Sequence, residues 1–107
     1  MDNFKIIYKI LKILEKYMDY ESVPTELISH EAFDISKERW SRILKMMIDT
    51  GLLEGARCIE VDGAMTPIIK LYNPSITLKG LEYLEENSMM KKAAGVVKGI
   101  KDTIPGL

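Results

Sequence analysis

The feature that most constrains the fold of this chain is a change of hydrophobic period at Gly51. Before this glycine, after a cap at Asp34 or Ser36, apolar residues recur at helical spacing: Trp40, Ile43, Leu44, Met47 and Ile48. After it, the runs LLEGARCIEV and TPIIKLYN favour strands, and Asp62-Gly63 between them predicts a hairpin turn. Glycine suits the left-handed conformation that ends helices. We therefore expect a helix that passes directly into a β-hairpin, in an α+β fold.

Two further helices are expected before this one. The first has an apolar side made of Ile7, Ile10, Leu11, Leu14, Tyr17 and Met18, and an opposite side carrying Lys5, Lys9, Lys12 and Lys16. The lysine stripe is typical of a solvated helix face. A short second helix is expected over residues 24–31, with Pro24 near its start and Leu27 and Ile28 as inward residues.

The stretch ITLKGLEYLEEN, residues 76–87, predicts a helix after the hairpin, with Thr77 as its N-cap and Leu81 and Leu84 inward. Gly80 lies within it and weakens it by about 1 kcal/mol relative to alanine. Because Gly80 shares a side with Leu84, we expect the missing Cβ to permit close packing of the helix backbone on its neighbour.

Three helices, a hairpin and further helices, with GLLEGARCIEV directly after the third helix, resemble a winged helix-turn-helix domain. The phrase ITLKGLEYLEEN, the helix after it and the ending IKDTI are similar to the YjcQ-like family, small winged-helix proteins of Gram-positive bacteria and their phages or prophages. The resemblance implies a winged helix over residues 1–87 with a two-stranded wing, and an additional amphipathic helix over residues 88–107. It implies no established biochemical activity.

Composition favours a cytoplasmic, non-enzymatic protein. The 107 residues suffice for one domain, and a formal net charge of −1 gives no global attraction to nucleic acid or to an anionic membrane. One cysteine, Cys58, and one histidine, His30, cannot by themselves build a disulfide or a Cys/His zinc cluster. His30 is expected to interact with the terminal carbonyls of the second helix. We expect no catalytic constellation, no metal, no cofactor and no membrane span.

Double-stranded DNA is the first candidate partner, because the helix before a wing enters the major groove in helix-turn-helix proteins. The candidate contacts are Lys37, Arg39, Ser41, Arg42 and Lys45 on that helix and Arg57 on the wing. The pairs Glu38–Arg42 and Lys45–Asp49 are spaced to neutralise one another on the helix surface. The hairpin tip DGAMTP supplies no basic residue. These features weaken the expectation of transcription regulation through DNA.

A protein partner is the alternative. Apolar residues of the last segment recur at spacings of three and four, as in the seam between paired helices: Met90, Ala93, Val97, Ile100 and Ile104. This seam predicts self-packing, a homodimer or capture of another protein. The chain would then be an adaptor that keeps the winged-helix scaffold without binding DNA.

Overall fold

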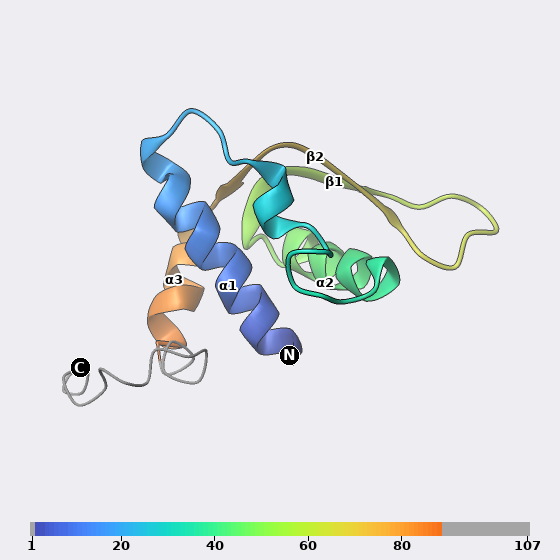
Figure 1. Ribbon diagram of the computed structural model, residues 1–107, viewed down its shortest axis with the longest axis horizontal. Helices are drawn as coiled ribbons and strands as arrows, with labels where there is room; N and C mark the ends of the chain where they lie inside the picture. The colour runs from blue at the N-terminus through green and yellow to red at the C-terminus, as the bar shows by residue number, and fades with distance from the viewer. Residues whose placement is uncertain (1, 89–107) are drawn as a thin grey trace.

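The computed structural model describes residues 2–88, in which helices surround one face of a β-hairpin (Figure 1). The elements are α1 (Asn3–Lys16), α2 (Lys37–Asp49), β1 (Leu53–Ile59), β2 (Ile68–Ile76) and α3 (Leu78–Glu86), with short 3-10 helices at Tyr17–Asp19 and Thr25–Ile28. The strands form an antiparallel two-stranded sheet, and the loop that joins them extends beyond the helices in Figure 1. This order confirms the α+β winged-helix class. The additional carboxy-terminal helix lies outside the described residues.

The core lies between α1, α2 and the base of the hairpin. Its fully buried side chains are Ile6, Ile10, Leu11, Leu14, Ile28, Ile43, Leu44 and Met47. The predicted apolar sides of α1 and α2 are thereby confirmed, but Met18 is 58% exposed and its inward placement was wrong. The reason is that α1 ends at Lys16 and continues as a 3-10 helix, whose 3.0-residue turn moves the following side chains off the helical stripe.

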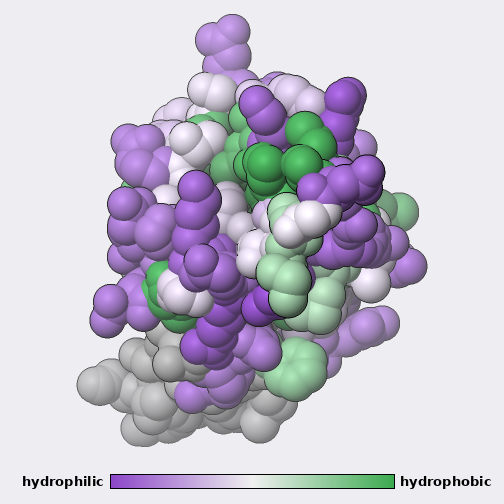
Figure 2. Space-filling view, turned by 90° about the vertical axis from the view of Figure 1, so that its right-hand side faces the viewer, coloured by the Kyte–Doolittle hydropathy of each residue, from purple (hydrophilic) through white to green (hydrophobic). Residues whose placement is uncertain are grey.

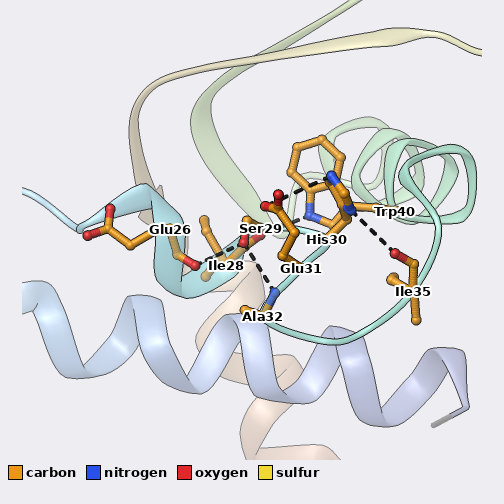
Figure 3. Close-up of polar contacts among 8 residues, drawn as sticks. All are labelled: Glu26, Ile28, Ser29, His30, Glu31, Ala32, Ile35 and Trp40. Atoms are coloured by element: carbon orange, nitrogen blue, oxygen red, sulfur yellow. Dashed lines mark hydrogen bonds and ion pairs between the residues drawn. The ribbon is translucent and has the colours of Figure 1, made fainter.

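The second helix is shorter than predicted and of another type, a single 3-10 turn at Thr25–Ile28. Ile28 is buried as expected, whereas Leu27 is 38% exposed and was wrongly placed inside. Figure 3 shows why the turn stops: the Ser29 hydroxyl donates to the Glu26 carbonyl at 3.0 Å and accepts from the Ala32 amide at 3.2 Å. The Ser29 hydroxyl thereby occupies the Glu26 carbonyl, an acceptor that the next turn of a helix would use.

Helix α2 is anchored at both its cap and its buried side. Ser36 accepts a hydrogen bond from the Arg39 amide at 3.1 Å, and the Trp40 indole donates to the Ile28 carbonyl at 2.8 Å (Figure 3). Trp40 is buried, as predicted. His30 does not meet the last carbonyls of a helix. Its Nδ1 lies 3.3 Å from the Ile35 carbonyl, in the loop that leads into α2.

The hairpin, called the wing below together with its connecting loop, has a longer loop than predicted, because β1 ends two residues before the end of the predicted run LLEGARCIEV and β2 begins two residues after the start of TPIIKLYN. A tight turn at Asp62-Gly63 is confirmed by the bond from the Ala64 amide to the Val61 carbonyl at 2.9 Å. Pairing nevertheless stops at Ile59 opposite Ile68. Residues 60–67 therefore form an eight-residue loop, the wing loop. Pro67 has no amide to extend the ladder.

The start of α3 closes the base of the wing. The Thr77 hydroxyl accepts from the Gly80 amide at 3.0 Å, which confirms it as the N-cap, and donates to the Gly51 carbonyl at 2.5 Å. A Cβ on Gly80 would collide with the Leu52 carbonyl oxygen and lie 2.7 Å from Cγ1 of Ile76. The expected close approach at Gly80 is therefore confirmed.

Candidate interaction surface

The first turns of α2 carry three of the residues predicted to touch DNA. Lys37 is exposed, while Arg39 is half-buried and its Nε donates to the side-chain oxygen of Asn3 at 2.9 Å. Ser41 is only 2% exposed, so its predicted place on the outer face was wrong. Ser41 lies one turn before Leu44 and falls within the buried side of a helix that packs on both α1 and the sheet. A duplex cannot reach it in this fold.

The middle of α2 contacts the wing loop through Lys45. Lys45 Nζ lies 2.7 Å from a carboxylate oxygen of Asp49, as the sequence predicted, and 3.7 Å from a carboxylate oxygen of Glu60 in the wing loop. The hydrogen bond to Asp49 is the main cause of a raised pKa at Lys45. Two carboxylates of the chain itself therefore neutralise the charge that Lys45 would offer to a phosphate.

Arg42 makes a different contact from the one expected. Its Nη2 lies 3.5 Å from the Met65 carbonyl of the wing loop, and within residues 2–88 it forms no ion pair with Glu38. The predicted Glu38–Arg42 pair was wrong, because the wing loop lies within reach of the guanidinium. Arg42 and Lys45 together connect α2 to the wing loop.

Arg57 lies on the side of the wing that faces away from α2. In the strand register Arg57 is opposite Lys70, and Cys58 is opposite Ile69. Side chains alternate between the two faces of a strand. The inner face holds half-buried Cys58, as predicted, and Ile69, which packs against the core. Arg57 and Lys70 consequently share the outer face.

The outer face of the wing comprises five side chains: Arg57, Ile59, Ile68, Lys70 and Tyr72. The Arg57 guanidinium lies over the Tyr72 ring, 5.3 Å from its centroid. Lys70 and Tyr72 were not among the predicted site residues. Strand alternation could have paired them with Arg57, had the register of the hairpin been known.

The wing loop and the first residue of β2 expose apolar side chains rather than basic ones. Met65 is 87% exposed, and Val61 and Ile68 are each about half exposed. Figure 2 views the molecule from the side on which the wing extends in Figure 1, and it shows hydrophobic atoms gathered on this face among hydrophilic ones. Glu60 and Asp62 are the charged residues of the loop. As predicted, the loop has no cation for a phosphate.

Most of the chain matches one known protein family. The model of the YjcQ protein family matches residues 8–103. The chain belongs to this family. No curated protein and no solved structure shows a significant match.

The six predicted DNA contacts of this YjcQ-family chain do not form one continuous surface. Lys37, Arg39 and Arg42 occur on α2, Lys45 is bound by two carboxylates, Ser41 is buried, and Arg57 is on the far side of the wing. The predicted seam residues, Met90, Ala93, Val97, Ile100 and Ile104, lie outside the described part of the chain. The homodimer stays a prediction.

Residues 2–88 of the YjcQ-family chain contain neither a metal-binding cluster nor a membrane-spanning helix. No group of three or more histidine, cysteine, aspartate or glutamate side chains in that range is placed to hold a metal ion. None of the helices in that range has the length and apolar character needed to cross a membrane.

Proposed function

We propose that the protein is a non-enzymatic regulatory protein that binds another protein through its wing. The observation that carries the proposal is the exposure of Val61, Met65 and Ile68 at the end of the wing, where a DNA-binding wing would carry cations. Exposed apolar side chains that gather on one face, surrounded by polar ones, are a mark of protein contact sites. The winged-helix fold is kept, and the apolar side chains exposed on its wing suit contact with the surface of another protein.

The charges of α2 support the same proposal. An adaptor that has no use for DNA is expected to neutralise the cations of this helix within the chain. Lys45 does this through Asp49 and Glu60, and the Arg42 guanidinium approaches the Met65 carbonyl. Glu60 and Asp62 also place negative charge on the wing, where it would repel phosphates.

Site-specific photo-crosslinking in the native host tests this proposal. A benzoylphenylalanine at Met65 should form a covalent adduct with a partner protein, because this side chain projects into solvent. The same group at Lys12, on the exposed side of α1, is the control and should form none. Ile68→Asp, made in the protein that carries the probe at position 65, should abolish the adduct because it places a charge within the exposed apolar surface. The fold should survive this change, since Ile68 is outside the core. No adduct at position 65, an equal one at position 12, or one that survives Ile68→Asp would refute the proposal.

DNA binding is the second candidate, favoured by the amino-terminal half of α2. Lys37 is exposed there, and Arg39 and Arg42 lie within the next two turns. If these three cations each neutralise one phosphate, the logarithm of the association constant should fall with the logarithm of salt concentration with a slope of about −2.7.

Fluorescence anisotropy with pooled genomic duplexes at several salt concentrations tests this second candidate. Lys37→Glu with Arg42→Glu should remove the salt-dependent binding, and Lys79→Glu, on α3, should not. Absence of salt-sensitive binding by the unaltered protein rejects DNA as a partner.

A further inference from the structure

The outer face of the wing contains two like charges directly opposite one another. Arg57 pairs with Lys70 in the strand register, and both side chains are exposed. Opposed side chains of an antiparallel pair have Cβ atoms about 4.5–5.5 Å apart, and like charges at that distance destabilise the hairpin. Across residues 2–88, no carboxylate forms an ion pair with either side chain. Within this described range, the pair of cations has no carboxylate as a counter-charge.

The position of one of the two charges is fixed by its neighbour. The Arg57 guanidinium lies over the ring of Tyr72, which is 57% exposed. Stacking on an aromatic ring holds a guanidinium in place while its N–H groups at the edge can still donate. Arg57 and Lys70 therefore present donors to a group that approaches the outer face.

An apolar pair lies next to the charged pair. Ile59 is opposite Ile68, two residues further along each strand. Two residues of a strand span about 6.6–6.8 Å, and the intervening side chains point to the other face. On the outer face, the distance between the cationic pair and the aliphatic pair thus equals the distance between residues i and i+2 of an extended chain.

These side chains fit carboxylates better than a nucleic-acid backbone. An arginine fork binds a carboxylate through two parallel hydrogen bonds, and a lysine adds a third donor. Two cations could neutralise only about two phosphates of a nucleic acid. Glu54, Glu60 and Asp62 on the same hairpin would repel a longer polyanion. The aliphatic pair Ile59–Ile68 has no use in binding phosphates.

We propose that the outer face of the wing binds an extended, acidic segment of a partner protein. A carboxylate of that segment contacts Arg57 and Lys70, and an aliphatic side chain two residues along contacts Ile59 and Ile68. The inference rests on the proposed function and names the chemistry of the partner. The matching motif is an acidic residue, any residue and then a branched aliphatic residue, within an extended segment.

Amide chemical shifts of the full-length, isotope-labelled protein test the inference with a short synthetic peptide in which one serine separates a glutamate from a valine, so that both lie on the same side of an extended segment. The lysine–valine peptide is the same peptide with lysine in place of glutamate. The acidic peptide should shift the amides of residues 57, 59, 68 and 70 in a saturable manner. The lysine–valine peptide should leave them unchanged. Arg57→Glu with Lys70→Glu should weaken binding of the acidic peptide by roughly tenfold or more and create binding of the lysine–valine peptide.

The control variant carries the same change of charge elsewhere. Lys5→Glu with Lys79→Glu places glutamate in the first turns of α1 and α3, where an acidic residue is favourable for a helix, and should bind the acidic peptide unchanged. Loss of binding in this control, or binding that survives the substitutions at Arg57 and Lys70, would overturn the inference. Tighter binding of a single-stranded oligothymidine to the same amides would show that the partner class is wrong. None of these results alters crosslinking at Met65, so failure here is distinct from failure of the proposed function.

Discussion

Substituting Gly80 by alanine sets two effects of opposite sign against each other. Alanine favours a helix over glycine by about 1 kcal/mol. Its Cβ, however, would collide with the Leu52 carbonyl oxygen and lie 2.7 Å from Cγ1 of Ile76. Overpacking costs about 1–3 kcal/mol, and the upper value applies where the obstacle is backbone rather than a side-chain tip. The Leu52 carbonyl also accepts from the Thr77 amide at 3.3 Å, which limits its movement.

The expected net result for Gly80→Ala is a loss of about 2 kcal/mol in the free energy of unfolding. For a domain of this size the corresponding fall in Tm is roughly 8–16 °C. Urea unfolding followed by circular dichroism measures the loss, with an unchanged m value as evidence that the native and unfolded states keep their compactness. Leu78→Ala is the matched control in α3: Leu78 is 72% exposed, and its loss should change stability by about 0.5 kcal/mol or less. A stabilised Gly80→Ala protein would refute the close-packing argument.

Three further outcomes are expected. Thr77→Ala removes the cap of α3 and should lower the free energy of unfolding by about 1–2 kcal/mol in the same urea assay. Thr77→Ser keeps a capping hydroxyl and should retain most of the stability of the unaltered protein. Trp40→Phe leaves the buried Ile28 carbonyl without its donor and should lower that free energy by about 1–3 kcal/mol. Burial is the main cause of a raised pKa at Tyr8 and Tyr83. As pH rises, these two tyrosines lose their protons in the unfolded chain before they do so in the folded one. The free energy of unfolding should therefore be unaffected below the ordinary tyrosine pKa of 10.0 and should fall as pH rises above it. Urea unfolding at several alkaline pH values measures this fall.

The parts of the fold that depend on local pattern could be predicted from the sequence. The helical period predicted the buried sides of α1 and α2. Thr77 was predicted as the cap of α3, and Ser36 was one of the two candidate caps of α2, the other being Asp34. Gly80 was interpretable because a poor helix former within a good helix needs a packing reason. These features depend on residues within a few positions of one another, so a sequence contains them directly.

The errors arose where a side chain or a distant segment decides the outcome. Ser29 ended the second helix by bonding to backbone groups, although the apolar pattern of the segment would have allowed another turn. Ser41 is buried because α2 is covered from two directions, which broadens its inward side beyond one stripe. Arg42 meets the wing loop instead of Glu38, and that contact depends on how an eight-residue loop folds back over the helix. Helical spacing alone could not reveal these contacts.

The base of the wing has a consequence for how proteins of this design can diversify. The Thr77 hydroxyl joins the end of α2 to the start of α3 through Gly51, and the Thr77 amide bonds to the Leu52 carbonyl. These hydrogen bonds fix the base of the hairpin to the ends of the two helices, and residues 60–67 take no part in them. Insertions, deletions or grafted sequences at the far end are therefore compatible with an intact interior. Such a chain can change the sequence of its wing loop while its scaffold stays the same.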